Sequence, residues 1–311
     1  MKVMAMSVFD YAGSLYRIVE AINLNTYNHV NYAVMFPVDY VSQFKRYPPI
    51  YKMTSNDEAI ITSDDIERMN LLLDDCDLVH LKTDYSAIHS TFSRFNINKP
   101  IIQTVCGSSF RNMEQDKIEE YKKLTTFRTA LNPDLNIPEW DGIYTPFAYD
   151  TIKFDNVWKE NKKITIAHSP STRKKKGTEI FLSACKKLNI DVILIENEKH
   201  NECLNMRSKA TIFFDQANCG SYGNSAVEAM AMGIPTMAYI SDSSYKQSNG
   251  KLDNCPVINC GNTEESISKA IENALSLNLK KLSKETKRWC DEQHSYKSIG
   301  TMWDKIYKEI V

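Results

Sequence analysis

Short apolar runs alternate along the chain with longer amphipathic segments, a pattern typical of strand–helix–strand units around a parallel sheet. Residues 2–8 predict a first strand. After a turn at 10–13, apolar residues recur at helical spacing from Leu15 to Ile22 and predict a helix. In this half of the chain we expect further strands at 31–36, 78–82, 100–105 and near 126–131, with a helix at 64–75.

The same alternation restarts at residue 163. We expect strands at 163–168, 191–195, 211–214, 235–240 and 256–260, and helices at 177–188, 200–209, 223–232, 263–275 and 279–290. The last segment, 295–310, has the apolar stripe of an amphipathic helix, and a short connector at 144–160 joins the two halves. The pattern predicts an α/β protein of two doubly wound, Rossmann-like domains.

Composition narrows the class of protein. The 311 residues include 38 Lys+Arg and 39 Asp+Glu, a net charge of −1, which argues against a general polyanion binder. No apolar run reaches the roughly 18–20 residues of a membrane span, and the N-terminal run, broken by Asp10, is too short for a signal peptide. Eight scattered cysteines without a CxxC predict reduced thiols in a cytoplasmic protein, with neither a disulfide framework nor a zinc site.

A turn with two glycines, at 215–223, separates the expected strand TIFFD from a helix that begins near Asn224. Glycine lets the backbone approach a ligand closely, and a helix N-terminus offers unpaired N–H groups and a positive dipole end. Gly220 and Gly223 therefore favour an anionic ligand, and Glu228, about one turn into the helix, is placed to reach a ligand hydroxyl. An ordinary strand–turn–helix with a solvated glutamate fits the same residues.

Four consecutive cations, Arg173 to Lys176, follow the strand expected to end at His168. At the carboxyl end of a strand they suit a pyrophosphate, because Arg offers a planar fork and Lys a point charge. A run of charges is also typical of a solvated surface, and a lone histidine is more often packed than catalytic. Both interpretations stay open on these residues alone.

Taken together, HSPSTRKKKGTE at 168–179 and DQANCGSYGNSAVEAMAMGIPTMA at 215–238 resemble the donor-binding half of a GT-B glycosyltransferase. The resemblance is to the group 1 family, mostly retaining, nucleotide-sugar-dependent enzymes with many bacterial, archaeal and phage members. It is strong over 164–240 and looser in four other segments: Asp10–Gly13 (which includes Ala12), CDLVHL at 76–81, TVCGSSFR at 104–111 and TPFAYDTIKF at 145–154. It implies a GT-B fold, in which two Rossmann-like domains face a central cleft.

The resemblance also implies roles for segments and residues. It makes 1–150 an acceptor-side domain, 151–294 a nucleotide-sugar donor-side domain, and 295–311 a helix that crosses back to the first domain. Arg173 and Lys176 would bind the donor diphosphate, Glu228 the ribose, and the backbone of Cys219–Gly223 the sugar and phosphates. The full donor-binding set is Gly13, His168, Ser169, Arg173, Lys176, Gly177, Cys219, Gly220, Ser221, Tyr222, Gly223, Asn224 and Glu228. The sugar or acceptor side would comprise Arg17, Gly107, Ser108 and Arg111.

The chain departs from the family pattern in two places. Family members often carry two glutamates with seven residues between them, and the first of these, which binds the transferred sugar, is Gly220 here. The loop that often supplies a histidine to the sugar has Val105–Cys106 before Gly107. His80 is the candidate substitute, with a buried structural histidine as the alternative. Asp10 and Asp84, at strand ends, are the candidates for a general base.

These inferences predict the transfer of a sugar from a nucleoside-diphosphate sugar to an acceptor hydroxyl, with retention and without a metal or cofactor. Arg173, Lys176 and a helix N-terminus would stabilise the leaving diphosphate. The acceptor could be a glycan, a lipid, a protein or a modified DNA base, so nucleic acid is expected only as an acceptor and no stable membrane insertion is expected. The alternatives are an epimerase or hydrolase of the same fold, and a degenerate nucleotide-sugar-binding protein.

Overall fold

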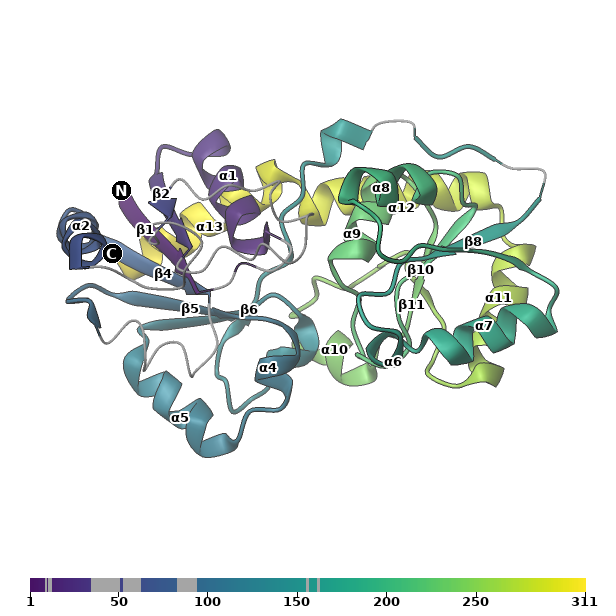
Figure 1. Cartoon of the computed structure of the whole chain (residues 1–311), viewed down its shortest axis with the longest axis horizontal. Helices are drawn as coiled ribbons and strands as arrows, with labels where there is room; N and C mark the ends of the chain where they lie inside the picture. Colours follow the sequence, from purple (N-terminus) through teal and green to yellow (C-terminus); the bar gives the residue numbers. More distant parts are fainter. Residues whose placement is uncertain are drawn as a thin grey trace. The chain divides into compact units, whose positions relative to one another are not determined.

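The computed structural model describes residues 1–8, 10, 13–34, 51–52, 63–82, 94–154, 157–160 and 163–311, with only the backbone at 51, 52, 108 and 109. The expectations for Ala12 and Asp84, and for the side chain of Ser108, lie outside these residues. The chain forms two compact units: Met1–Ala148 with Tyr296–Val311 make unit 1, and Tyr149–Ser295 makes unit 2 (Figure 1). Each unit is built on a parallel sheet.

Unit 1 has a seven-stranded sheet in the order β3-β2-β1-β4-β5-β6-β7, with every pairing parallel. Its strands are β1 (Lys2–Ser7), β2 (His29–Val34), β3 (Tyr51–Lys52), β4 (Leu78–Lys82), β5 (Ile101–Val105), β6 (Phe127–Ala130) and β7 (Ile143–Tyr144). The central strands are buried except at the first residue of β1 and of β5, as expected of a parallel sheet covered by helices on both faces.

Among the residues that the structure describes, unit 1 has five α-helices: α1 (Ser14–Asn25), α2 (Ser63–Asp74), α4 (Gly107–Arg111), α5 (Gln115–Leu124) and α13 (Tyr296–Ile310). The C-terminal helix α13 packs along α1, at the opposite end of the sequence (Figure 1). Gly300 permits the close approach, because a methyl group there would collide with the backbone carbonyl of Ala21. Trp303 and Tyr307 of α13 are fully buried and lie against His80 of β4.

Unit 2 has a five-stranded parallel sheet in the order β12-β11-β10-β8-β9. The strands are β8 (Thr165–His168), β9 (Asp191–Leu194), β10 (Ile212–Phe214), β11 (Thr236–Ala238) and β12 (Ile258–Asn259). The helices are α6 (Arg173–Lys176), α7 (Thr178–Lys187), α8 (His200–Arg207), α9 (Asn224–Ala231), α10 (Asp242–Gln247), α11 (Glu264–Ser276) and α12 (Leu279–His294).

The two faces of this sheet carry separate apolar cores. Ile212 and Phe214 pack on one face with residues of α7 and α11, while Phe213 packs on the other with residues that include Leu204 of α8 and Ala229 of α9. Successive residues of β10 thus point to opposite faces, which is the period of a strand. Helix α12 in turn packs on α9.

The structure differs from the sequence-based expectation in a few elements. Residues 173–176 form one helical turn between extended Thr172 and left-handed Gly177 instead of a loop. Helices α4, α5 and α10 and strands β3 and β7 were not expected. Helix α5 buries only Ile118 and Tyr121, and α10 buries only Ser244, so neither carries a strong apolar period.

Candidate functional site

The carboxyl ends of β8 and β10 form the topological switch point of unit 2, because β9 lies on one side of this pair and β11 on the other. Ligands of open α/β sheets bind outside the strand ends at such a point. Strand β8 leads there into Ser169, and β10 leads into Asp215 and Gln216. The two segments singled out by the sequence therefore meet at the edge of one sheet.

The loop between β10 and α9 is braced by Gln216, whose side chain is completely buried. Its amide nitrogen donates to the carbonyl oxygens of Ser221 (2.7 Å) and Tyr239 (2.9 Å), and its amide oxygen accepts from the N–H of Cys219 (2.6 Å). Gly220 adopts φ +70°, a conformation that favours glycine. These contacts fix the course of the backbone from residue 219 to the start of α9.

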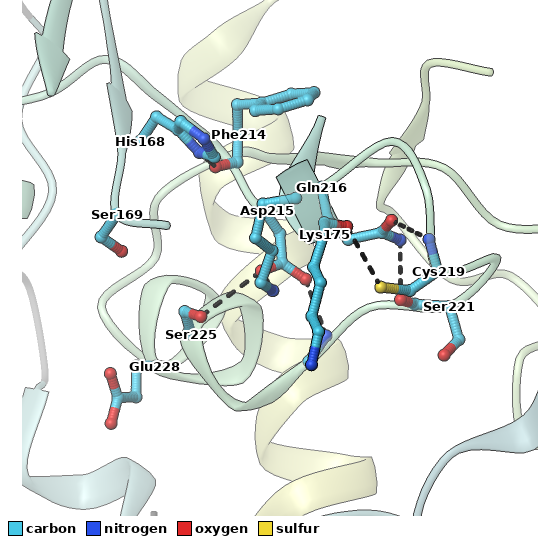
Figure 2. Close-up of polar contacts among 12 residues, drawn as sticks. His168, Ser169, Lys175, Phe214, Asp215, Gln216, Cys219, Ser221, Ser225 and Glu228 are labelled. Atoms are coloured by element: carbon cyan, nitrogen blue, oxygen red, sulfur yellow. Dashed lines mark hydrogen bonds and ion pairs between the residues drawn. The ribbon is translucent and has the colours of Figure 1, made fainter. Parts of the chain in front are cut away.

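Asp215 occupies the N-terminus of α9. Its carboxylate accepts hydrogen bonds from the N–H of Gly223 (2.7 Å), from Nζ of Lys176 (2.7 Å) and from Oγ of Ser225 (3.4 Å). Figure 2 shows Ser225 pointing toward Asp215, with Glu228 farther along the same helix. Asp215 is 1% exposed and Lys176 14% exposed, so the ammonium is held at the first turn of α9 yet stays in reach of solvent.

Arg173 has a different environment from Lys176. Its guanidinium, 44% exposed, binds Glu196 through Nε (2.9 Å) and Nη2 (2.8 Å) and Glu179 through Nη1 (2.9 Å). The hydrogen bonds from Arg173 lower the pKa of Glu196. These contacts tie Arg173 to α7 and to the segment after β9, whereas Lys176 is tied to the first turn of α9.

Glu228, one turn into α9, is held on both carboxylate oxygens. Oε1 lies 2.8 Å from Nε2 of His200, and Oε2 accepts from Nη1 of Arg207 at 2.9 Å. Arg207 also donates to Oγ of Ser169 (2.9 Å) and to the carbonyl oxygen of Ser225 (3.2 Å). Arg207 thereby connects the end of β8 to α9.

The sequence analysis missed both His200 and Arg207. They lie seven residues apart on α8, which is two turns, so both project from one face of the helix. Arg207 is 2% exposed and lies over the ring of Phe213, 4.6 Å from its centroid. Burial alone would lower the pKa of Arg207, but the Glu228 carboxylate outweighs it and the pKa is raised. The seven-residue spacing was the available signal.

Several expected donor-site side chains point into unit 2 instead. The ring of His168 is completely buried, with Nδ1 3.0 Å from the carbonyl oxygen of Phe214 and Nε2 2.8 Å from Oγ1 of Thr178. Burial lowers the pKa of His168 to about 4, so the ring is neutral. Tyr222 is 2% exposed, with its hydroxyl 3.0 Å from Nε2 of His294. Neither side chain is exposed, so a role of the His168 side chain in ligand binding is corrected. The expectation for Tyr222 concerned its backbone and stays a prediction.

The remaining expected donor residues are turn or helix-start positions. Gly177, with φ +71°, separates α6 from α7, and Gly223 and Asn224 begin α9. Ser221 is buried, while Cys219 is partly exposed. At these positions, backbone groups and not side chains are the groups available to a ligand near Lys176.

Unit 1 carries a second cluster at the carboxyl ends of β1 and β4, its own switch point. Asp10 accepts from the N–H groups of Leu15 (3.0 Å) and Tyr16 (2.9 Å), from Nζ of Lys82 (3.0 Å) and from the hydroxyl of Tyr32 (2.8 Å). Gly13, with φ +59°, forms the turn into α1, as expected of the first loop.

This environment does not favour Asp10 as a general base. Burial would raise the pKa of Asp10, but Lys82 and the two backbone N–H groups outweigh burial and the pKa is lowered. A carboxylate with a lowered pKa accepts protons weakly. Asp10 instead fixes the start of α1, and Lys82, which the sequence analysis did not single out, is its buried partner.

The other unit 1 candidates are also structural in their contacts. His80 is fully buried, with Nδ1 2.8 Å from the hydroxyl of Tyr307 and Nε2 2.7 Å from Oγ1 of Thr104, and burial lowers its pKa to about 3. These contacts correct the catalytic expectation in favour of the structural alternative. Arg111 binds Asp134 through two nitrogens (2.6 and 3.1 Å), and Arg17 is 2% exposed. Gly107 begins α4 with φ +77°.

No protein-family model matches the sequence, and no curated protein matches it. Solved structures match over nearly the whole chain. HepE (Alr3699) of Anabaena, in complex with UDP and glucose, matches with a TM-score of 0.69 at 11% identity, covering 99% of this chain and 100% of that one. Sucrose-phosphate synthase of Thermosynechococcus elongatus matches with a TM-score of 0.67 at 11% identity, covering 99% of both chains. The chain has the GT-B fold.

A third match extends the GT-B comparison to another enzyme. MnaA of S. aureus, in complex with UDP, matches with a TM-score of 0.58 at 13% identity, covering 100% of this chain and 97% of that one. The GT-B fold expected from the sequence is thereby confirmed.

The ranges that the structure describes contain neither a metal-binding cluster nor a membrane-spanning helix. There, no group of three or more His, Cys, Asp or Glu side chains is arranged to hold a metal ion. Among the helices of those ranges, none is both long and apolar enough to span a bilayer.

Proposed function

We propose that this protein is a glycosyltransferase that moves a sugar from a nucleoside-diphosphate sugar to an acceptor hydroxyl, with retention and without a metal ion. The observation that carries the proposal is the cluster at the switch point of unit 2, where Lys176 lies at the first turn of α9 and Glu228 lies one turn further. The GT-B fold supports it, as do the UDP and UDP-glucose complexes of HepE.

In this proposal the donor diphosphate is bound by Lys176 and by backbone N–H groups at the start of α9 other than that of Gly223, which Asp215 holds. Lys176 remains 14% exposed although Asp215 holds it, so its other two N–H donors are available to phosphate oxygens. The helix N-terminus adds a positive partial charge. Arg173 reaches the diphosphate only after leaving Glu196 or Glu179, so we assign the larger contribution to Lys176.

Glu228 would bind the ribose hydroxyls of the donor. His200 and Arg207 each bind one oxygen of this carboxylate. The carboxylate held in this way would accept hydrogen bonds from the ribose diol. The two protein contacts fix the plane of the carboxylate, so its oxygens are already oriented to accept hydrogen bonds from the diol. This lowers the entropic cost of binding.

The transfer breaks the bond between the anomeric carbon and the diphosphate oxygen and forms a bond from that carbon to the acceptor oxygen. In the retaining route the acceptor attacks on the face that the diphosphate leaves, and the acceptor proton passes to a diphosphate oxygen. Negative charge grows on the leaving diphosphate, and Lys176 with the α9 N-terminus stabilises it there. This route requires no protein nucleophile or general base. The acceptor is a glycan, lipid, protein or modified DNA base.

A nucleotide-sugar epimerase is the second candidate, because a UDP-N-acetylglucosamine 2-epimerase of Listeria monocytogenes also matches, with a TM-score of 0.57 at 12% identity. Epimerisation needs acid and base groups beside the sugar. Around Lys176, the carboxylates of Asp215 and Glu228 are already paired and His168 is buried and neutral. The described part of the site therefore favours transfer.

The test combines binding and turnover. Titration calorimetry with UDP, GDP, ADP and TDP should find at least one ligand, and a panel of radiolabelled nucleotide sugars should then label an acceptor fraction. Label released as free sugar or as an epimer would support the second candidate instead. If no nucleoside diphosphate or nucleotide sugar binds, both functions are excluded.

Two variants test the assigned residues. Lys176→Ala should weaken nucleoside-diphosphate binding by about 10–100-fold, the worth of a charge-assisted hydrogen bond of about 1.5–3 kcal/mol. Lys174→Ala, in the same helical turn but exposed, is the matched control and should bind as the parent does. Glu228→Gln should abolish the preference for the ribonucleotide over its 2′-deoxy analogue. Equal binding by the Lys176 and Lys174 variants would contradict the assignment.

A further inference from the structure

A groove in unit 2 lies at the sheet edge opposite the candidate donor site. It has a volume of about 560 Å³ and is lined by the segment before β8, the end of α9 and one face of α12. The indole nitrogen of Trp158 donates to the carbonyl oxygen of Thr211, just before β10, and Gly233 precedes β11. These residues mark the amino-terminal ends of the strands, whereas Asp215 and Lys176 lie at the carboxyl ends.

The lining of this groove is strongly basic although the whole chain has a net charge of −1. Its five cations face two carboxylates, which leaves a net charge of +3 on the lining: Lys159, Lys280, Lys284, Lys287, Arg288, Glu160 and Asp291. Lys280, Lys284 and Arg288 are spaced by four residues along α12, so they form one stripe. Lys159 joins them from the segment before β8.

Internal ion pairs account for only part of this charge. Lys287 binds Asp291 at 2.6 and 2.8 Å, and Nε of Arg288 lies 4.0 Å from Glu292. Within the described ranges, Lys159, Lys280 and Lys284 have no carboxylate within 4 Å. The C-terminus of α9, which ends at this groove, contributes about half a negative charge at most. Three of the five cations therefore have no ion-pair partner among the described residues, and they repel one another.

We infer that this groove is a second anion-binding site, for a small phosphorylated molecule with at least two negative charges. Lysine ammonium groups suit phosphate oxygens as point charges. The volume lies within the roughly 300–1,000 Å³ of small-molecule sites. Trp158, whose N–H is already used by Thr211, adds an apolar wall for the rest of the ligand. The site is separate from the donor site and does not rest on the proposed glycosyl transfer.

The test measures the binding of inorganic pyrophosphate to the full chain. The donor site is first saturated with the nucleoside diphosphate that binds best; if no nucleoside diphosphate binds, pyrophosphate is added alone. Calorimetry should detect pyrophosphate binding that weakens as the salt concentration rises. Hydrogen exchange should then slow in peptides that cover 157–160 and 279–291. Slowing confined to the peptides around Lys176 and α9 would overturn the second site and leave the proposed function standing.

Matched double variants distinguish a specific anion-binding site in the groove from nonspecific electrostatic attraction to the whole protein. Lys280→Gln with Lys284→Gln should lower the pyrophosphate affinity at least tenfold and should not change nucleoside-diphosphate binding. The control, Lys269→Gln with Lys281→Gln, removes the same charge from exposed positions outside the groove and should retain the affinity. Equal losses in both pairs would overturn the inference.

A parallel experiment distinguishes a soluble ligand from a lipid headgroup. It measures the binding of the parent and of both double variants to vesicles with 30% phosphatidylglycerol in phosphatidylcholine. Pyrophosphate binding that depends on Lys280 and Lys284 supports the inference, with or without vesicle binding. Vesicle binding that depends on these lysines, without any pyrophosphate binding, overturns it in favour of a membrane surface.

Discussion

Replacing Arg207 by Met tests whether the buried ion pair organises the candidate site. Methionine retains a long apolar side chain against Phe213 but removes the donors to Glu228, Ser169 and the carbonyl oxygen of Ser225. Glu228, 8% exposed, then keeps only His200 of the two partners described above. The substitution therefore removes the cationic partner of a buried carboxylate.

The expected loss follows from the burial of both partners. Breaking a buried pair by removal of one partner costs about 3–5 kcal/mol, because the remaining charge stays out of water. Unfolding free energies are typically about 5–15 kcal/mol, so unit 2 should still fold, with a lower urea midpoint. Glu228→Gln in the Arg207→Met background should restore part of the loss, with a coupling energy of about 1–3 kcal/mol.

The assay is urea unfolding of the four chains of this double-mutant cycle. Hydrogen exchange of peptides from α8 and α9 reports on unit 2 alone, since each unit holds two tryptophans and whole-chain fluorescence mixes the two. Arg207→Lys serves as the control that keeps the charge and should lose less than Met. A loss below about 1 kcal/mol for Arg207→Met, or strict additivity in the cycle, would refute the reasoning.

The remaining predictions concern pH and packing. His80 and His168 have pKa values of about 3 and about 4 in the folded chain, below the ordinary 6.5. Between the folded and the unfolded pKa of each histidine, the unfolded chain binds more protons than the folded one. The free energy of unfolding therefore falls as the pH drops below 6.5. Each histidine should cost about 1.4 kcal/mol per pH unit once the pH is well below 6.5, measured by urea unfolding between pH 7 and 5. His168→Gln should flatten the unit 2 profile. Gly300→Ala should destabilise unit 1 by about 1–3 kcal/mol, seen as a lower thermal midpoint, because the methyl group meets the backbone of α1; exposed Thr301→Ala should change it little.

The fold class was predictable because strands of a buried parallel sheet read as short, mostly apolar runs. Strands β4 and β5 lie within a residue of their expected bounds for this reason. Helix α5 was missed because its sequence is mostly charged and only two of its side chains are buried. The one-turn helix α6 was missed because it depends on the left-handed conformation of Gly177 and not on an apolar period.

The site was predictable in its location and less so in its contacts. The position of Lys176 at the start of α9 agrees with the expected anion site, whose ligand-binding role stays a prediction. The contacts of Glu228 with Arg207 and His200 come from α8, and pairing between helices cannot be inferred from one sequence. The same holds for His168 and His80, whose burial depends on partners distant in sequence.

The path of the chain through the two units has a consequence for biosynthesis. Unit 1 takes its last helix, α13, from the extreme C-terminus, while unit 2 is continuous. On the ribosome, the sheet of unit 1 emerges first but has to wait for the final fifteen residues of the nascent chain before α1 and His80 are covered. Unit 2 is therefore the part able to reach its native state earlier, and premature termination near the 3′ end of the message damages the half of the protein that was translated first.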